Sequence, residues 1–372
     1  MKIIAYYLPQ FHTFPENDAW WGKGYTEWTS VKKAEPIFEN HYQPRVPYRE
    51  NYYNLTDANV IKWQADIAKK YGVYGFCLYH YWFEGKMLMY KPAEILLQNK
   101  DIDIPFCMCW ANHTWTRAWN EHSREVILEQ TYGDESDWTK HFYYFLQFFR
   151  DERYIKINNK PVLVIYKPDD IPVLEEMLEC WKKLAIENGL EGICFMYQQY
   201  SYNHQKDKAG KLFDYGIEFQ PGKVKDEQLI HTIPIAWRKL KNVVVNKLGV
   251  RQTKSSSMWY DYDDVWRRIL KSKPLDEKMI PGAFVDFDNT PRYKKMAAIY
   301  YGATPEKFQH YLSLQIKHTK EVYHKDMLFM FAWNEWGEGG YLEPDQKYEY
   351  KMLEAIKSAL LENEELPIKD EK

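Results

Sequence analysis

The chain of 372 residues carries 50 Lys and Arg against 53 Asp and Glu, so its net charge is only −3. This balance argues against a protein that attracts nucleic acid through its overall field, and we expect no nucleic-acid partner. A composition of 45% hydrophobic and 28% charged residues excludes a disordered chain and a coiled coil. The length allows either two ordinary domains or one large α/β barrel.

Short apolar runs alternate along the chain with longer amphipathic stretches, which is typical of a mainly parallel sheet with helical crossovers. The apolar runs predict eight strands, at 2–8, 73–80, 104–110, 161–166, 192–198, 213–219, 281–287 and 327–333. The amphipathic stretches predict helices at 56–71, 91–99, 136–150, 171–188, 258–273, 304–324 and 346–361. We expect helix N-caps at Thr56, Ser136 and Thr304, and C-terminal stops at Gly72 and Gly189.

Eight strands with helical crossovers favour a single α/β domain, a (β/α)8 barrel spanning 1–361, over a doubly wound sheet. The first strand runs into Leu8-Pro9-Gln10 and not into a glycine-rich phosphate-binding loop, which weakens the case for a nucleotide cofactor. The segment 362–372 reads as a charged C-terminal tail.

The start of the chain and its cysteines favour a cytoplasmic protein. The start lacks the apolar region and cleavage site of a signal peptide, and no apolar run approaches the roughly 20 residues that span a bilayer. The five cysteines are an odd number in apolar runs, so we expect reduced core thiols and not a disulfide framework.

Aromatic residues are unusually frequent, with 15 Trp, 31 Tyr and 18 Phe making 17% of the chain. Trp and Tyr combine a flat apolar face with a polar group, which suits ligands that have apolar C–H faces and many hydroxyls. Sugars are such ligands. An aromatic-rich core with Tyr hydroxyls at its edge is the structural alternative.

Polar and aromatic side chains gather where the predicted strands end. In a βα barrel these ends share one face, where active sites lie. The candidate substrate-binding residues are Tyr6, Gln10, His12, Trp21, His80, Trp82, Trp110, Asn112, His113, Asp286, Arg292, Asn334 and Trp336. Among them we expect the indoles of Trp21, Trp82, Trp110 and Trp336 to wall the sugar subsites, and His80, Asn112, His113 and Arg292 to bond sugar hydroxyls.

Glu335 and Glu338 are the candidate catalytic pair. Residues three apart point to opposite faces of an extended strand, but a turn brings them within roughly 5–6 Å, and Gly337 with Gly339-Gly340 permits one. That is close to the separation of the two carboxyl groups in a retaining glycosidase. Mutual repulsion should leave one protonated as the acid and the other ionised as the base. Helix capping or pairing with Lys or Arg is the structural alternative.

We expect no metal and no cofactor. The histidines His12, His41, His80 and His113 form no short spaced pair with one another, and Asp286 with Asp288 lacks the rest of a calcium loop. Contacts to sugar hydroxyls are the favoured role for these side chains.

The segment 221–257, between the sixth and seventh strands, departs from the barrel pattern as a basic insertion. It contains eight Lys and Arg against Asp226 and Glu227, a net charge of +6. Apolar residues recur among these cations at helical spacing, at Ile233, Trp237, Leu240, Val244 and Leu248. A solvated connecting helix is the favoured interpretation, and an interfacial helix that touches anionic lipid is the alternative, with peripheral contact at the inner membrane.

Several long motifs resemble the WbsX family of bacterial polysaccharide biosynthesis, described as glycosyltransferases or as similar to glycoside hydrolase family 99. The resemblance covers nearly the whole chain, and 221–257 and the tail match least. The motifs are the run from Ala5 to His12, Glu16-Asn17-Asp18, Trp20 to Thr29, Gly75 to Trp82, Trp110-Ala111-Asn112-His113, and Trp333 to Gly339.

The resemblance implies a retaining, metal-free (β/α)8 enzyme similar to the endo-acting α-mannosidases and α-mannanases of family 99. By analogy Glu335 is the base that deprotonates the sugar 2-OH, and Glu338 is the acid that protonates the leaving oxygen. The implied intermediate is a 1,2-anhydro sugar, which requires the 2-oxygen and leaving group to be trans, as in α-manno and α-rhamno sugars. The chain has Trp336-Gly337-Glu338 where family 99 has Trp-His-Glu.

Three functions remain open at this stage. The first is a retaining glycoside hydrolase or transglycosidase that acts on an α-manno- or α-rhamno-configured bacterial glycan. The second is a glycosyltransferase of lipopolysaccharide or O-antigen biosynthesis. The expected substrate of the enzyme is a glycan or a lipid-linked oligosaccharide. The third is a non-catalytic glycan-binding barrel, which loss of either glutamate would indicate, and both glutamates are present.

Overall fold

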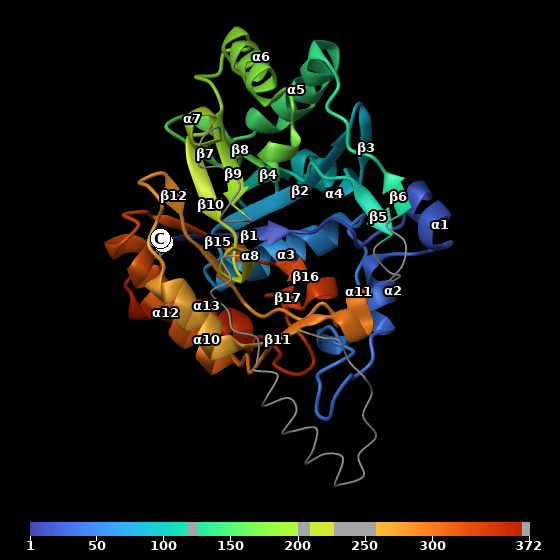
Figure 1. Ribbon diagram of the computed structural model, residues 1–372, viewed down its shortest axis with the longest axis vertical. Coiled ribbons are helices and arrows are strands. Elements are labelled where there is room, and N and C mark those ends of the chain that lie inside the picture. Colours follow the sequence, from blue (N-terminus) through green and yellow to red (C-terminus); the bar gives the residue numbers. More distant parts are fainter. Residues whose placement is uncertain (118–124, 200–208, 227–257, 367–372) are drawn as a thin grey trace.

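The computed structural model describes residues 1–117, 125–199, 209–226 and 258–366 (Figure 1). Its central sheet follows the order β12-β10-β9-β8-β4-β2-β1-β15-β13, with all neighbours on this path parallel. These strands are β1 (Lys2–Tyr7), β2 (Gly75–Phe83), β4 (Phe106–Trp110), β8 (Lys160–Ile165), β9 (Cys194–Gln199), β10 (Tyr215–Glu218), β12 (Met279–Ile280), β13 (Gly282–Phe284) and β15 (Met327–Phe331).

The seventh predicted strand closes the sheet into a barrel, although it is split in two. Pro281 separates β12 from β13, because a proline has no N–H to donate to a strand ladder. The first half pairs with β10 and the second with β15. A side chain at Gly282 would meet the Glu218 carbonyl oxygen at 1.9 Å, so the closure depends on glycine. The predicted (β/α)8 barrel is confirmed.

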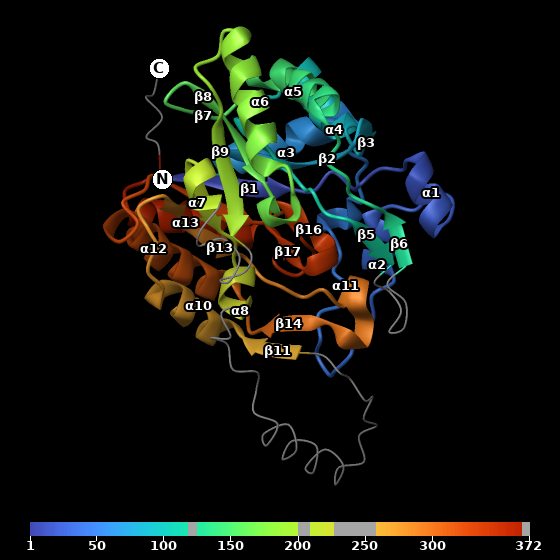
Figure 2. The same ribbon diagram turned by 45° about the horizontal axis from the view of Figure 1, so that its top comes forward.

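Amphipathic helices cover the outside of the barrel in two groups. Figures 1 and 2 show α5 and α6 together on one side and α10, α12 and α13 together on another. The long helices are α3 (Ala58–Lys70), α4 (Lys91–Gln98), α5 (Glu135–Phe149), α6 (Leu174–Glu187), α10 (Tyr262–Lys271), α12 (Pro305–Glu321) and α13 (Lys351–Glu362).

Shorter elements lie between the barrel strands and helices. The short helices are α1 (Pro15–Trp21), α2 (Glu27–Lys32), α7 (Ala209–Leu212), α8 (Gly222–Asp226) and α11 (Thr290–Tyr293), with 3-10 turns η1 (Tyr48–Glu50), η2 (Pro168–Asp170), η3 (Lys294–Met296) and η4 (Trp336–Glu338). The remaining strands are β3 (Lys86–Leu88), β5 (Trp115–Arg117), β6 (Glu125–Leu128), β7 (Lys156–Ile157), β11 (Met258–Asp261), β14 (Ala298–Tyr301), β16 (Asn334–Glu335) and β17 (Gly340–Tyr341).

Some predicted helix boundaries need correction. The N-cap of α12 is Thr304 as predicted, but α3 and α5 begin at caps Asp57 and Asp134, whose carboxylates accept hydrogen bonds from the first turn. Residues 258–261 form β11 and not helix, since they pair in parallel with β14. The Asp261 side chain then caps α10 by accepting from the Asp264 amide.

Alternate residues of each barrel strand point inward or outward. The ring of Tyr6 in β1 stacks on Tyr79 of β2 at 5.5 Å and meets Phe219 and Phe329 at 5.6 and 5.7 Å. These rings come from different sides of the barrel, so they fill its interior. His80 in β2 instead packs on α5, so neighbouring residues of one strand have opposite surroundings.

Most of the basic segment 221–257 lies outside the described residues, as do 367–372 of the predicted tail. In the described part, Lys223 of α8 is buried and its ammonium lies 3.3 Å from the Glu218 carboxylate. The idea that all eight cations of the segment face a membrane is therefore wrong for Lys223. Glu365 pairs with Lys320 of α12, which anchors the start of the tail. Among the described helices, none is long and apolar enough to cross a membrane.

Candidate active site

The turn after β15 presents the two predicted glutamates. Strand β16 pairs antiparallel with β17, and the 3-10 turn η4 between them carries Glu338. Gly339 closes the turn in the left-handed conformation, with φ +67°, which glycine adopts without strain. A side chain at Gly340 would meet the Phe331 ring at 2.2 Å. The predicted turn is present, and it needs its glycines for conformation and for space.

Arg292 of α11 bridges the two glutamates. One terminal guanidinium nitrogen donates to Glu335 Oε1 at 2.6 Å, and the other donates to Glu338 Oε1 at 2.7 Å. Because both carboxylates bind neighbouring nitrogens of one planar group, they are held close together. The expectation that Arg292 bonds sugar hydroxyls is corrected for this structure, in which its donors face carboxylates.

Glu27, the first residue of α2, is a third carboxylate at this site. Its Oε1 accepts from Arg292 Nε at 2.8 Å and lies 2.8 Å from a terminal nitrogen of the same guanidinium. Glu27 is buried, with only 4% of its surface exposed. One cation therefore serves three carboxylates, so the site carries an excess of negative charge whenever all of them are ionised.

Burial controls the protonation of Glu335. Removal from water raises the pKa of this carboxyl to about 8, although the Arg292 charge acts in the opposite direction. The negative charges of Glu338 and Glu27 add to the increase. Glu338 is more open, with 25% of its side chain exposed. The two carboxylates thus have the unequal surroundings that an acid and base pair requires.

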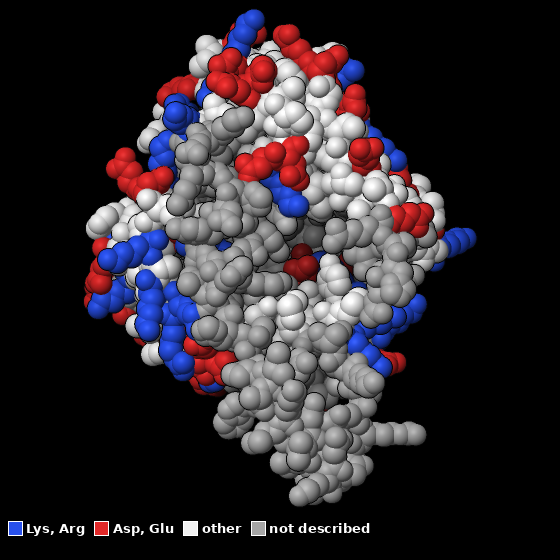
Figure 3. Space-filling model, in the orientation of Figure 1, with Lys and Arg blue, Asp and Glu red and all other residues white. Residues whose placement is uncertain are grey.

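Tyrosines surround the glutamates. Burial raises the pKa of Tyr79 and Tyr81, and the nearby charge of Glu335 raises it further. Burial likewise raises the pKa of Tyr25 to about 12, with the charge of Glu27 as a second cause. The phenols therefore stay protonated and can donate hydrogen bonds. Figure 3 shows acidic atoms recessed in a hollow of the surface, as expected for carboxylates at the floor of an open cleft.

Three predicted site residues lie outside the barrel wall, under α5 and α6. The Trp82 ring stacks on His141 at 4.4 Å, and its indole N–H lies 3.2 Å from both Asp137 oxygens. His80 Nε2 is 3.0 Å from His141 Nε2, and Trp110 packs on His141 at 4.9 Å. Their predicted contacts with sugar are therefore corrected: these three side chains pack the helices onto the barrel.

Two of the predicted sugar-binding residues, Asn334 and Asn112, instead bond the backbone of a neighbouring strand end. Asn334, completely buried, accepts from the Leu8 amide at 2.7 Å and donates to the Leu8 carbonyl at 3.0 Å. Asn112 accepts from the Lys167 amide at 2.8 Å and donates to the Lys167 carbonyl at 2.6 Å. These bonds join the ends of neighbouring strands, so neither amide is available to a sugar here.

Trp336 is also corrected, from a subsite wall to a support beneath the catalytic turn. Its indole is completely buried, stacks on Tyr341 at 3.7 Å and donates to Glu343 Oε2 at 2.7 Å. Glu343 accepts further bonds from Tyr53 at 2.7 Å and Gln64 at 2.6 Å. Burial raises the pKa of Glu343 to about 7. No local pattern in the sequence marks Glu343 as a buried carboxylate.

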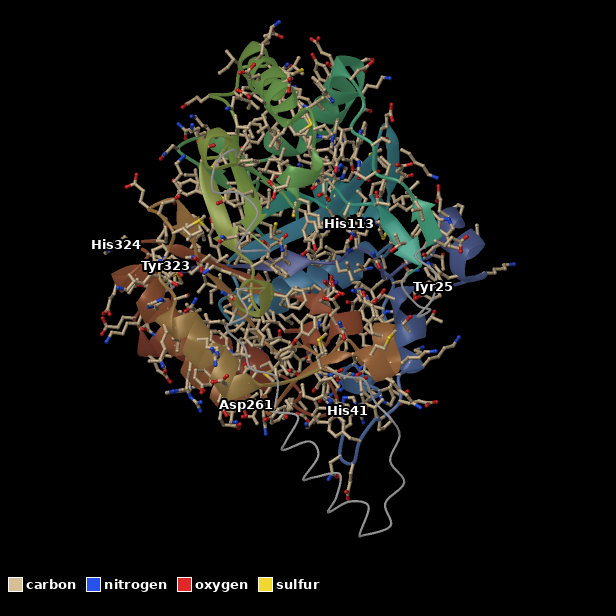
Figure 4. All side chains as sticks on the ribbon, viewed as in Figure 1. Tyr25, His41, His113, Asp261, Tyr323 and His324 are labelled. Carbon is tan, nitrogen blue, oxygen red and sulfur yellow. The ribbon has the colours of Figure 1, made fainter. Side chains whose placement is uncertain are left out.

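Asp286 stabilises the turn from another direction. Its carboxylate lies 2.8 Å from a terminal nitrogen of Arg45, which also donates to the Gly339 carbonyl at 3.1 Å. Neighbouring Asp288 accepts from His41 and Gln43, each at 2.8 Å. Figure 4 labels His41 in the lower part of the view. Asp286 therefore positions Arg45, and Arg45 in turn bonds the backbone of the turn at Gly339.

The other predicted residues lie at the carboxyl ends of strands β1 and β4 or in the loops that follow them. Gln10 approaches the Tyr81 hydroxyl, and the half-buried Trp21 ring lies 5.9 Å from Tyr25. The half-buried His113 ring is 5.4 Å from Tyr166 (Figure 4). Tyr6 and His12 are buried, Tyr6 within the barrel and His12 against the Phe14 ring at 5.9 Å.

A separate cavity lies away from this site. It has a volume of about 500 Å³ and is lined by residues at the amino ends of β8, β9 and β10, with Tyr323 and His324. Figure 4 places Tyr323 and His324 at the edge of the view opposite Tyr25. Active sites of βα barrels lie at the carboxyl ends of the strands, which is the face that carries the glutamates and not this cavity. Within the described ranges, no group of three or more His, Cys, Asp or Glu could hold a metal ion.

The fold and this arrangement define the class of the protein as an α/β barrel with a cluster of carboxylates at the carboxyl ends of its strands. Two solved structures of the GH99 endo-α-mannosidase from Bacteroides thetaiotaomicron, one in complex with bis-tris-propane, share the fold with a TM-score of 0.54 at 12% identity, covering 97% of this chain and 96% of theirs. A protein described as glycoside hydrolase-like aligns with a TM-score of 0.55 at 10% identity, over 96% of this chain and 93% of its own.

The chain belongs to the WbsX glycosyltransferase family, whose model matches residues 3–356. Two WxcX proteins, from two strains of Xanthomonas campestris pv. campestris, are each 33% identical over 365 residues. The alignment covers 96% of this chain but 49% of each relative. The chain thus spans about half the length of the curated relatives it matches.

Proposed function

We propose that the protein is a retaining glycosidase or transglycosidase that uses Glu335 and Glu338 on an α-manno- or α-rhamno-configured glycan. The observation that carries the proposal is the convergence of both carboxylates on Arg292, at 2.6 and 2.7 Å, on the carboxyl-end face of the barrel. A close pair of carboxyl groups is the arrangement of retaining enzymes. The fold shared with GH99 endo-α-mannosidases supports the same reaction class.

The proposed reaction has two steps. Glu335 takes the proton of the sugar 2-OH, and the 2-oxygen attacks C1 as Glu338 protonates the leaving oxygen. The products of this step are a 1,2-anhydro sugar and the released alcohol. Glu338, now ionised, then takes a proton from water or from an acceptor hydroxyl as that oxygen opens the three-membered ring at C1. Glu335 returns its proton to the 2-oxygen. Two inversions at C1 retain the configuration.

The exposed tyrosine and tryptophan faces support a glycan substrate. Tyr79, Tyr25, Trp21 and His113 are half-buried, so part of each side chain is open to a ligand. The charge of Glu335 acts on Tyr79, and the charge of Glu27 acts on Tyr25. We propose that these side chains, with Gln10, form the sugar subsites in place of the buried Trp82, Trp110 and Trp336. An aromatic face and a protonated phenol suit the C–H face and hydroxyls of a sugar.

To test this, the protein is incubated with α-linked manno- and rhamno-oligosaccharides, and the variants E335Q and E338Q serve as negative controls. We expect cleavage or transfer whose first product keeps the α configuration by NMR, and none with either variant. An inverted product would contradict the mechanism. Unchanged turnover in either variant would contradict the assignment of that residue.

A glycosyltransferase is the second candidate, because the family model that matches the chain carries that description. The same incubations with nucleotide-activated mannose or rhamnose and an acceptor oligosaccharide separate the two candidates. Release of the nucleoside diphosphate together with elongation of the acceptor would favour the transferase. Cleavage or disproportionation of oligosaccharides without a nucleotide sugar favours the glycosidase or transglycosidase.

We also propose that a lipid-linked form of the glycan is the substrate and that 221–257 brings the protein to an anionic membrane. The support is the basic character of this segment, which has seven Lys and Arg against Asp226 and Glu227 when the buried Lys223 is left out. Each cation near such a surface contributes about 1 kcal/mol, and salt screens this contribution. Co-sedimentation with anionic vesicles at low salt, released at high salt, is the expected result. No sedimentation at low salt would contradict it.

A further inference from the structure

The Glu27–Arg292 pair fixes how the guanidinium faces the two glutamates. Glu27 Oε1 holds the inner edge of the guanidinium, through Nε and one terminal nitrogen, each at 2.8 Å. With that edge fixed, the terminal nitrogens point one at Glu335 and the other at Glu338. A planar guanidinium gripped along one edge cannot turn about its own axis without breaking these bonds. Glu27 itself bonds neither glutamate.

Glu27 is itself held by a short, well-anchored helix. Thr26 and Thr29 form a reciprocal capping box around the first turn of α2. The next residue, Trp28, is buried, packs on Trp336 at 5.4 Å and donates its indole N–H to the Tyr53 carbonyl at 2.9 Å. The carboxylate that grips Arg292 therefore stands on an element locked against the support of the catalytic turn.

Glycine at position 337 makes room for this pair. A Cβ atom there would lie 1.9 Å from Glu27 Oε1 and 2.8 Å from Arg292 Nε. Gly337 has no left-handed φ, so the requirement is for space and not for backbone freedom. The Glu27–Arg292 pair occupies the volume that any side chain at 337 would need.

From these contacts we propose that Glu27 is a positioning residue, which aims Arg292 at both catalytic glutamates in the space left by Gly337. Glu27 acts on the reaction through Arg292 and does not touch the reacting sugar. The proposal rests on the proposed function for the roles of Glu335 and Glu338. The placement of Arg292 by Glu27 can be tested without any substrate.

The experiment compares E27A, E27Q and G337A with wild type, and uses E16Q as the matched control. Glu16 is a paired carboxylate on the neighbouring helix α1, 3.2 Å from Lys86, and has no contact with Arg292. The substrate-free readouts are the crystallographic position of Arg292 and the NMR titration of the Glu335 carboxyl in protein labelled with ¹³C-glutamate. Turnover of the active oligosaccharide from the preceding test supplies kcat and KM.

We expect E27A and G337A to displace Arg292 and to lower kcat by about 10- to 100-fold with little change in KM, because small misplacements in a catalytic site have such costs. E27Q keeps an oxygen acceptor, so it should hold Arg292 and restore kcat to near wild type. It also removes a charge that raises the pKa of Glu335, so the titration should move to lower pH. E16Q should behave as wild type.

Three results would overturn the proposal: wild-type kcat in E27A, Arg292 still bonded to both glutamates in E27A or G337A, or E27Q as slow as E27A. Failure of the proposed function would look different. In that case E335Q or E338Q would keep turnover, while the Arg292 position and the Glu335 titration would still report on Glu27.

Discussion

Glu335 and Glu343 are two buried carboxylates at either end of one turn, and their surroundings differ. Glu335 is 5% exposed, faces the cleft and shares the Arg292 guanidinium with Glu27 and Glu338. Glu343 is 3% exposed and accepts bonds from three neutral donors, Tyr53, Gln64 and Trp336. Burial raises both pKa values, to about 8 and about 7.

The difference is the one expected between a reactive carboxylate, the role proposed for Glu335, and a structural one. A carboxylate that shares one cation with others gains or loses a proton as its neighbours change charge, which suits acid and base chemistry. A carboxylate fixed by three neutral donors holds those donors in place, and through Trp336 it holds the turn. The predictions below test this division, from the largest expected effect to the smallest.

E335Q and E338Q should each lower kcat/KM on the active oligosaccharide by at least about 10²- to 10⁴-fold, the contribution of a positioned acid or base. E343Q, the matched control at the other end of the turn, should lose far less, because Glu343 is held by three neutral donors and not by Arg292. Steady-state kinetics of the three variants give the comparison. A loss of kcat/KM in E343Q equal to that in E335Q would contradict the distinction between a reactive and a structural carboxylate.

Arg292→Met should destabilise the protein by roughly 3–5 kcal/mol, because it leaves three carboxylates together without their cation. Without the cation, the mutual repulsion of the carboxylates favours protonation in the folded state, so the folded protein binds more protons than the unfolded one. Stability is consequently lost as pH rises, and the loss should be greater at pH 8 than at pH 5. Urea unfolding at the two pH values measures it, and equal losses would speak against the shared-cation description.

Glu343→Gln should change how stability depends on pH. The folded pKa of about 7 lies above the ordinary value of 4.5, so between these values the folded state holds the extra proton. Wild-type stability therefore falls as pH rises from 4.5 to 7, by about 3 kcal/mol at most. The variant lacks this fall, so its deficit relative to wild type should shrink from pH 5 to pH 8. Urea unfolding at both values decides, and a constant deficit would contradict the raised pKa.

The pH dependence of kcat/KM should identify the role of Glu335. As the base it must be ionised, and with a pKa of about 8 only about a tenth of it is ionised at pH 7. In E338Q acting on a glycoside whose leaving group needs no protonation, only the ionisation of Glu335 matters, so we expect kcat/KM to rise about tenfold per pH unit below 8 and then level off. A profile that instead falls through pH 8 would assign the acid role to Glu335 and exchange the roles of the two glutamates.

Trp82→Phe should have the smallest effect, since this ring lies outside the barrel. The variant keeps a ring on His141 but loses the indole contact with the buried Asp137, at 3.2 Å. We expect a loss of about 1 kcal/mol in unfolding free energy, with kcat and KM unchanged. Thermal unfolding and kinetics check both. A large increase in KM would instead support the original prediction that Trp82 contacts the substrate.

Much of the fold, and the turn that brings Glu335 and Glu338 together, could be predicted from the sequence. The eight apolar runs match the barrel strands because a strand buried on both faces must be apolar along its length. The glycines after Trp336 predicted the turn that brings Glu335 and Glu338 together, because tight turns often need the backbone conformations that glycine adopts. Such signals are local, so one sequence is enough to carry them.

Only the tertiary structure decided which side of the barrel wall each strand residue faces. In β2 the residues alternate between the interior, as Tyr79 does, and the helices, as His80 and Trp82 do. Both faces of a helix-covered strand are apolar and aromatic, so the sequence has no contrast that distinguishes inside from outside. Tyr79 and Tyr81 were missed for this reason, and His80 and Trp82 were placed in the site.

The tertiary structure also decided which charges meet. Arg292 is separated from Glu27 by 265 residues and from Glu335 by 43, and neither spacing is a local signal. Glu27 stands inside a motif that the sequence analysis quoted, yet nothing nearby marks it as a partner of Arg292. The residue patterns determined the barrel and the pair of glutamates, because these follow from short-range periodicity and turn chemistry. The closing of the barrel determined the shared cation, because folding alone brings strand ends far apart in sequence to one face.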